Sequence, residues 1–294
     1  MSPPLSVLPP DRQRSLVLAD GRLLAWSEWG AEGDRSVLFC TGAGMSGSLG
    51  FATGEARDLG VRLVAVDRPG LGRSTPHPDR TLVSWAEDVS QLVRELGADS
   101  PPAVGFSQGS VFALALARAG VSRSVALVSG QDQLDHPPIL ALLPAPVARL
   151  VRDAATDPEG VERHLAESMT AEVLWALVIE MSGPEDRALY GSEPFSGTYR
   201  RTLAEGFAQG PRGYARDTLL SIAPWGFAPE EVPGPVHLWY GLRDTSPVHS
   251  PDFGATLAAR IPGARLHRLS GEGSAILWSR GREILEALLA ATED

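Results

Sequence analysis

The sequence contains no lysine, and this absence excludes several kinds of chemistry. Without a lysine amine the chain can form no Schiff base with pyridoxal phosphate or a carbonyl substrate, and it cannot form a Walker-type phosphate loop. Cys40 is the only cysteine, which rules out an intramolecular disulfide and a thiolate metal cluster. We therefore expect neither a metal nor an organic cofactor.

Long apolar runs and clustered positive charge are missing as well. No stretch approaches the roughly 20 apolar residues that span a bilayer, and the first residues lack the pattern of a signal peptide. The net charge is −10, and the 26 basic residues are scattered arginines. Because nucleic acids and anionic membranes are bound by clustered cations, we expect neither as a partner. The expected location is the cytoplasm, and the oligomeric state stays open.

What is present fits one globular unit of 294 residues, 43% of them apolar and 21% charged. Short apolar runs cover residues 15–18, 23–29, 36–40, 63–66, 103–106, 125–129, 236–240 and 265–269. Helical patterns alternate with them at residues 82–96, 108–119, 251–260 and 282–290. This alternation predicts an α/β fold with a mostly parallel central sheet flanked by helices, and Asp20-Gly21 predicts a hairpin between the first two strands.

A serine stands at a sharp turn from strand to helix. Residues 104–110 read V-G-F-S-Q-G-S, a G-x-S-x-G motif with an apolar strand before it and a helix of small residues after it. The two glycines remove side chains that would collide in such a turn. The helix N-terminus directs free N–H groups and the positive end of its dipole towards the hydroxyl. We therefore interpret Ser107 as an exposed nucleophile.

The pattern changes between residues 131 and 229, where apolar residues recur at helical spacing and no clear strand appears. Ile139–Val151 and Val173–Met181 carry more apolar surface than isolated helices can expose to water, and Pro144 breaks or kinks the first of them. We predict a core formed by residues 1–130 and 230–294, with residues 131–229 inserted as a helical cap. The cap should cover a pocket above Ser107.

The order of these elements resembles that of the α/β-hydrolase fold superfamily across nearly all of residues 15–290. Four motifs carry the resemblance. G-F-S-Q-G at 105–109 resembles the nucleophile elbow, and D-R-P-G-L-G-R-S at 67–74 resembles the loop after strand four. Y-G-L-R-D at 240–244 is similar to the turn with the catalytic acid, and T-G-A-G at 41–44 is similar to the oxyanion segment H-G-x-x-G.

The resemblance implies a role for each matching residue. Ser107 would be the nucleophile and Asp244 the acid, while the backbone N–H groups of Ala43 and Gln108 would bind the oxyanion. A helix cap is the alternative interpretation of Asp244, since Thr-Ser-Pro follows it.

The chain departs from the family at the catalytic histidine. Residues 269–275 read L-S-G-E-G-S-A, so that Ser274 stands where the family has the histidine. A serine cannot take the proton from Ser107, and in subtilisin the loss of the histidine lowers turnover by about six orders of magnitude. A relocated base is one alternative, with His136 or His249 as the candidates. His136 has Asp132 and Asp135 beside it, while His249 follows Asp244 closely and has helix capping as its competing interpretation.

We expect an enzyme that acts on a small, largely apolar molecule, by serine-dependent hydrolysis of an ester or a related acyl bond. The first alternative is a pseudohydrolase that binds a ligand or catalyses a cyclisation, an elimination or a rearrangement. The second is an active hydrolase in which Ser274 is a deliberate substitution of a natural histidine. If only the imidazole is missing, Ser274→His should raise acyl transfer at least about a hundredfold.

Overall fold

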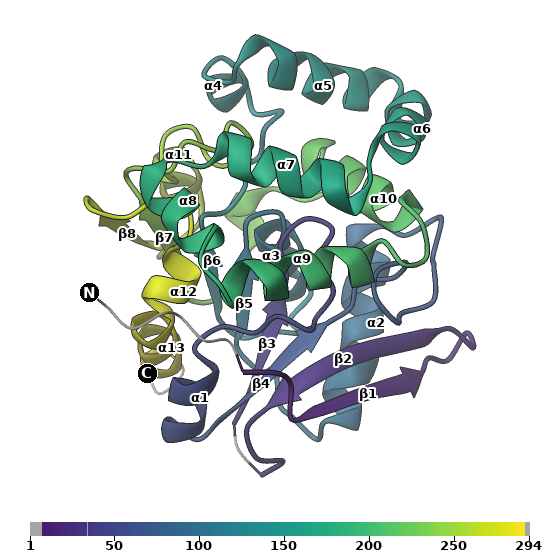
Figure 1. Cartoon of the computed structure of the whole chain (residues 1–294), viewed down its shortest axis with the longest axis vertical. Helices are drawn as coiled ribbons and strands as arrows, with labels where there is room; N and C mark the ends of the chain where they lie inside the picture. Colours follow the sequence, from purple (N-terminus) through teal and green to yellow (C-terminus); the bar gives the residue numbers. More distant parts are fainter. Residues whose placement is uncertain (1–7, 34, 292–294) are drawn as a thin grey trace.

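The computed structural model describes residues 8–33 and 35–291, which form a single sheet with helices on both faces (Figure 1). The sheet has eight strands in the order β1-β2-β4-β3-β5-β6-β7-β8. Their bounds are β1 Arg12–Val17, β2 Leu23–Trp29, β3 Arg35–Cys40, β4 Val61–Val66, β5 Ala103–Phe106, β6 Val125–Val128, β7 Val236–Gly241 and β8 Arg265–Leu269. β1 and β2 pair as an antiparallel hairpin and β2 is antiparallel to β4, whereas the other pairs are parallel. The predicted α/β fold with a mostly parallel sheet is confirmed.

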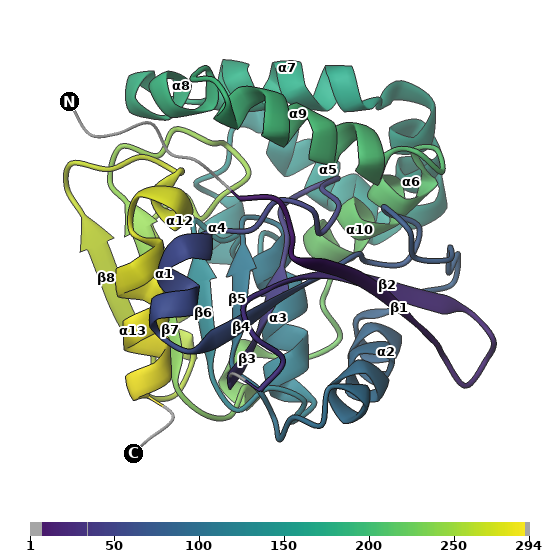
Figure 2. The same ribbon diagram turned by 60° about the horizontal axis from the view of Figure 1, so that its bottom comes forward.

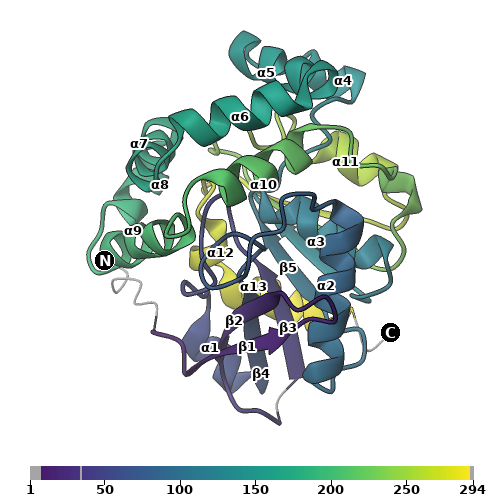
Figure 3. The same ribbon diagram turned by 90° about the vertical axis from the view of Figure 1, so that its right-hand side faces the viewer.

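Helices cover the sheet because its parallel strands are apolar on both faces. One face packs against α2 Leu82–Glu95, α3 Gly109–Arg118 and α11 Ala255–Arg260. The other face packs against α1 Thr53–Asp58, α12 Ile276–Ser279 and α13 Gly281–Ala290. Figure 2 shows α1 and α13 side by side, and Figure 3 shows α2 beside α3. Alternate residues of β3 divide between the two cores, with Val37 and Phe39 in one and Leu38 and Cys40 in the other.

A helical segment, residues 131–229, connects β6 to β7 and lies beyond the carboxyl ends of the strands (Figure 1). Its helices are α4 Pro137–Leu140, α5 Ala145–Thr156, α6 Pro158–Ser168, α7 Ala171–Met181, α8 Pro184–Tyr190, α9 Phe195–Gly206, α10 Arg212–Ile222 and the short 3-10 helix Pro229–Glu231. Pro144 lies between α4 and α5, where the sequence predicted a break. Among the described residues, no helix is both long and apolar enough to cross a membrane.

One helix is shorter than its sequence pattern predicts, and the difference bears on the site. The expected helix 251–260 begins only at Ala255, because Phe253 and Gly254 have φ angles of 54° and 76° in the left-handed region. The Asp252 carboxylate accepts hydrogen bonds from the N–H groups of Ala255 and Thr256 and so caps the shortened helix. Residues 242–254 are therefore free to form a loop beyond the end of β7.

Candidate active site

Ser107 occupies the sharp turn between β5 and α3, with a φ angle of 52° in the left-handed region. Its N–H donates to the carbonyl oxygen of Val128, 3.0 Å away, which ties the turn to the end of β6. The tight turn also explains the glycine at 105, since a side-chain carbon there would lie 2.6 Å from the Cα of Ser110. The hydroxyl of Ser107 is thus displayed at the carboxyl end of the central strands.

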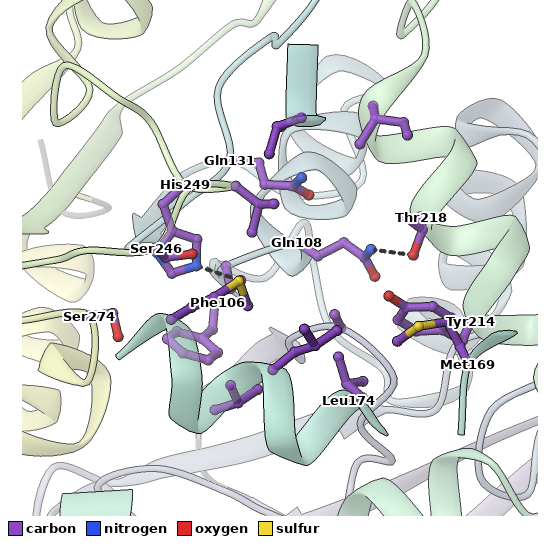
Figure 4. Close-up of a pocket in the computed structure, with 18 of the residues that line it drawn as sticks. Phe106, Gln108, Gln131, Met169, Leu174, Tyr214, Thr218, Ser246, His249 and Ser274 are labelled. Carbon is purple, nitrogen blue, oxygen red and sulfur yellow. Dashed lines mark hydrogen bonds between the residues drawn. The ribbon is translucent and has the colours of Figure 1, made fainter. Parts of the chain in front are cut away.

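His249 lies against this hydroxyl (Figure 4). Its Nε2 is 2.8 Å from Oγ of Ser107, and its Nδ1 is 2.7 Å from Oδ2 of Asp244. The histidine is only 7% exposed, so water competes little for either bond. Because a carboxylate can only accept, it holds the proton of a neutral imidazole on Nδ1 and leaves Nε2 as an acceptor facing the serine. The three side chains form one hydrogen-bonded row.

The loop after β7 supplies both the histidine and the carboxylate. The second oxygen of Asp244 accepts from the N–H of Ser246 at 2.9 Å, which fixes the carboxylate at the start of the loop. On the far side of the histidine, the N–H of Ser250 donates to the carbonyl of Gly130 at 3.0 Å. His249 is therefore held from both sides along its own backbone.

A buried carboxyl, Asp132, supports the loop from behind. The Ser250 hydroxyl donates to Oδ2 of Asp132 at 2.9 Å and also lies 3.0 Å from Oδ1 of Asp252. Burial raises the pKa of Asp132 to about 6, although hydrogen bonds from Ser250 and from the N–H of Gln133 oppose the rise. The Ser250 hydroxyl thus stands between two carboxyl groups. The sequence had paired Asp132 with His136, whereas the structure links it to Ser250.

Two backbone N–H groups reach the same place from different segments: Ala43 lies between β3 and α1, and Gln108 directly follows Ser107 in the turn between β5 and α3. Ala43 and Gln108 line the cavity that contains Ser107. Within the described part of the chain, the backbone N–H of neither residue donates a hydrogen bond. The buried guanidinium of Arg68 holds the segment, because it donates to the carbonyl oxygens of Thr41 and Gly42 at 2.6 and 2.9 Å. The loop geometry thus leaves donors free beside the serine.

The cavity has a volume of about 270 Å³ and is mostly apolar. The helical segment forms most of its wall, with side chains from α5, α6 and α7 that include Val147, Leu150, Val151, Leu165, Leu174 and Val178. Polar side chains interrupt the apolar lining beside Ser107 and His249 and also on the helical segment, at Ser182, Tyr190, Tyr199, Tyr214 and Thr218. Among the residues that the structure describes, no cluster of histidine, cysteine and acidic side chains is arranged to hold a metal ion.

Comparison with known proteins identifies the family. Residues 37–287 match the model of the alpha/beta hydrolase family. The chain belongs to this family. Among solved structures, an esterase from Rhodococcus sp. ECU1013 is 18% identical with a TM-score of 0.65, and the match covers 95% of this chain and 98% of that one. An enol-lactonase from Burkholderia xenovorans LB400 is 17% identical, with a TM-score of 0.65 and coverage of 96% and 100%.

A bromoperoxidase from Bacillus anthracis is similar to this alpha/beta hydrolase in the same way, at 18% identity and a TM-score of 0.68, with coverage of 98% and 100%. At such identities these structures share the fold, and their different activities show how much chemistry one fold accommodates. The resemblance predicted from the four motifs is confirmed at the level of the family.

Ser274 is bonded to residues of α8 rather than to the proposed nucleophile or acid. Its Oγ lies 3.0 Å from Oδ2 of Asp186, a residue of α8, and 3.4 Å from the hydroxyl of Tyr190. The backbone N–H groups of Ser274 and Ala275 donate to the same carboxylate at 2.8 and 2.9 Å. Although Ser274 lines the cavity, it is bonded to neither Ser107 nor Asp244 (Figure 4). The expectation of a vacant base position is wrong, because His249 fills the gap between acid and serine.

The other histidine candidate lies away from the serine. His136 is the residue before α4, and it does not line the cavity of Ser107. In the sequence, His136 and His249 were equally good candidates for the base, because both follow strands that end near the serine. What separates them is the loop after β7, whose course depends on contacts of Ser250 that no local pattern reveals. Asp186 and Gln131, which also border the site, carried no signal in the sequence.

Proposed function

We propose that this protein is a serine hydrolase that cleaves carboxylic esters or related acyl bonds of a small, largely apolar substrate. The observation that carries the proposal is the hydrogen-bonded row of Ser107, His249 and Asp244 below an apolar cavity. A histidine that is bonded to both a serine and a buried carboxylate is the arrangement that activates a hydroxyl nucleophile. The helical segment 131–229 serves as the cap that separates the reacting groups from water.

The reaction begins when Nε2 of His249 takes the proton of Ser107 as Oγ forms a bond to the substrate carbonyl carbon. The negative charge that develops on the carbonyl oxygen is held by the N–H groups of Ala43 and Gln108. Asp244 keeps the imidazole in the correct orientation and stabilises its charged form. Collapse of the intermediate breaks the bond to the leaving oxygen, which takes the proton from His249.

Water then completes the cycle. His249 removes a proton from a water molecule as the water oxygen attacks the acyl carbon, and the bond to Oγ breaks with return of the proton to Ser107. The product is the free acid. Every proton in this scheme passes through His249, so the scheme assigns no chemical step to Ser274.

The proposal predicts that the serine and the histidine are each indispensable. Ser107→Ala and His249→Ala should each lower the hydrolysis of p-nitrophenyl butyrate by at least about a thousandfold, since members of a triad act as a unit. A fluorophosphonate probe should label the parent protein at Ser107 and should not label the Ser107→Ala variant. Release of p-nitrophenol and mass spectrometry of the labelled protein provide the two measurements.

His136→Ala is the matched control, since it removes an imidazole that lies outside the cavity. Its rate should stay within about twofold of the parent rate, as expected for a change that is remote from the chemistry. Turnover that survives Ser107→Ala would exclude a covalent serine mechanism. Tight binding of esters without turnover or labelling would favour a pseudohydrolase instead.

A further inference from the structure

Two amide oxygens inside the cavity have no hydrogen-bond partner. They are Oε1 of Gln108 and Oε1 of Gln131, and neither finds a donor among the described residues. Each glutamine is only 4% exposed, and both line the cavity that contains Ser107. Buried acceptors are nearly always paired, so an unpaired acceptor in a cavity indicates a missing donor. Because both oxygens line the cavity of the nucleophile, they indicate that the ligand supplies a hydrogen-bond donor.

The hydrogen bonds around Gln108 fix which end of its amide faces the cavity. Its Nε2 lies 3.2 Å from Oγ1 of Thr218 and 3.4 Å from Oγ of Ser221. The hydroxyl of Ser221 donates its single proton to the carbonyl oxygen of Thr218 at 2.9 Å, so it can only accept from the glutamine. The nitrogen must therefore face Thr218 (Figure 4), which leaves the oxygen without a partner among the described residues.

Gln131 approaches the same space from the end of β6. Its backbone N–H lies 3.4 Å from the carbonyl oxygen of Ser107, which ties the residue to the nucleophile turn. In Figure 4 its side chain lies on the same side of the cavity as His249, whereas Leu174 of α7 lies on the opposite side. Gln108 directly follows Ser107 in sequence, and both glutamines line the cavity that contains the nucleophile.

The rest of the lining indicates that the missing donor is uncharged. Among the described residues around the cavity, none is aspartate, glutamate or arginine. An ammonium group would lose its hydration there and gain no carboxylate in return, at a large cost in free energy. An uncharged amide N–H or alcohol O–H can donate a hydrogen bond to a glutamine oxygen without this cost in free energy.

We propose that the substrate is an ester or lactone with an uncharged hydrogen-bond donor, an amide N–H or a hydroxyl, close to its reacting carbonyl. This inference rests on the proposed serine hydrolase function. Gln108 accepts from that donor, Gln131 offers a second acceptor in the same cavity, and the apolar wall of α5, α6 and α7 receives the remaining chain. A site with buried hydrogen-bonding groups rejects a substrate that lacks the matching group, because its polar atoms are then left unpaired.

The test compares p-nitrophenyl esters of equal length. N-butanoylglycine carries the amide N–H and 3-hydroxyheptanoate the hydroxyl, while N-butanoyl-N-methylglycine and heptanoate lack a donor. One donor ester should exceed its donor-free partners in kcat/KM by at least about a hundredfold, and the identity of that ester distinguishes an amide from an alcohol. Gln108→Met, which keeps the backbone N–H, should reduce this ratio at least tenfold. Gln91→Met, a change on α2 outside the cavity, should leave the ratio unchanged.

A binding measurement separates this inference from the hydrolase proposal. Calorimetry with Ser107→Ala compares the methyl esters of N-butanoylglycine, 3-hydroxyheptanoate and heptanoate, and one donor ester should bind at least about tenfold more tightly. Equal rates and equal affinities across the series would overturn the inference and show that only water meets the amide oxygens. Absence of hydrolysis and of serine labelling, together with preferential binding of a donor ester, would overturn the hydrolase proposal alone.

Discussion

The buried carboxylate of Asp186 accepts three hydrogen bonds, and water does not compete for them. It accepts from two backbone N–H groups and one hydroxyl at residues 274 and 275, and it comes from α8 of the helical segment. Ser274 itself is 5% exposed. A small residue at 274 is needed because the carboxylate and Tyr190 already fill the space around it.

This packing reverses the expectation for Ser274→His. An imidazole at 274 would press on Asp186 and Tyr190, and it would add no base, since His249 already bridges the acid and the serine. We expect the free energy of unfolding to fall by about 1–3 kcal/mol, the usual cost of overpacking a buried site. The rate of ester hydrolysis should not rise. Urea denaturation and a p-nitrophenyl butyrate assay measure the two effects.

Ser274→Ala is the matched control for that variant. It removes one hydroxyl but keeps the backbone N–H bonds to Asp186, so it should cost about 1 kcal/mol. A hundredfold gain in hydrolysis by Ser274→His would contradict the assignment of His249 as the base. Such a gain would instead support position 274, where the family motif places the histidine, as the position of the base.

The loop after β7 is the element that creates the site. Its course is set by backbone and side-chain bonds of Ser250 to Gly130 and Asp132, which stand more than a hundred positions earlier in the sequence. Such contacts leave no periodic pattern, which is why the sequence could name His249 as a candidate but could not choose it. The nucleophile turn at Ser107 was predictable because its motif lies in one short stretch of sequence, although its N–H also bonds to Val128.

The raised pKa of Asp132 predicts how stability changes with pH. Its value of about 6 lies above the ordinary 3.8, so between these pH values the folded state keeps a proton that the unfolded state has lost. The free energy of unfolding therefore falls as pH rises through this window, by about 3 kcal/mol for a shift of this size. Above about pH 6 the cost of the buried charge is fully present.

Asp132→Asn tests this prediction, because its side-chain oxygen can still accept from Ser250 while the amide does not titrate. Relative to the parent protein, the variant should gain stability between pH 4.5 and pH 8 in urea denaturation experiments, and it should keep its hydrolytic activity. Asp132→Ala should also lose the pH dependence, but it should be less stable than Asp132→Asn at every pH because Ser250 loses its partner. If the stability of Asp132→Asn and that of the parent changed with pH in the same way, another group would be responsible for the pH dependence.

At the scale of the whole molecule, a buried ionic group joins the helical segment to the sheet. Asp217 of α10 accepts from Arg68, 2.6 Å away in the loop after β4, and from Arg80. All three side chains are buried. Since Arg68 also holds the carbonyl oxygens of Thr41 and Gly42, one carboxylate links the cap to the segment that carries Ala43.

Removal of this carboxylate should be costly. Asp217→Asn leaves two buried guanidinium groups without a counter-charge and should lower the free energy of unfolding by about 3–5 kcal/mol. Glu231→Gln is the matched control. It breaks the surface pair of Glu231 with Arg118, whose side chains are 48% and 46% exposed, and should cost less than about 1 kcal/mol. Equal losses in urea denaturation would contradict the structural role of Asp217.

The sheet was more predictable than the helices around it. The strand at 103–106 has the bounds that its apolar run predicts, since a strand buried on both faces has a continuous apolar sequence. The partly exposed edge strand 265–269 also has its expected bounds. The short helices α1 and α12 were not predicted, because each is held by tertiary packing rather than by its own pattern. In the helical segment the apolar surface of α7 was evident, but its packing partners were not.

Because Asp244 and His249 are close in sequence, the proposed acid and base can be moved into another protein together, which the motif comparison did not suggest. Acid and base lie five positions apart on one continuous loop, so a single peptide carries both. In the proposed mechanism, only the serine turn must be matched to it from elsewhere, and the chain between β8 and α12 takes no catalytic part. A transplant of residues 241–250 into another member of the fold would move the acid and the base together, and the recipient's own histidine loop would then be free to vary in length and sequence.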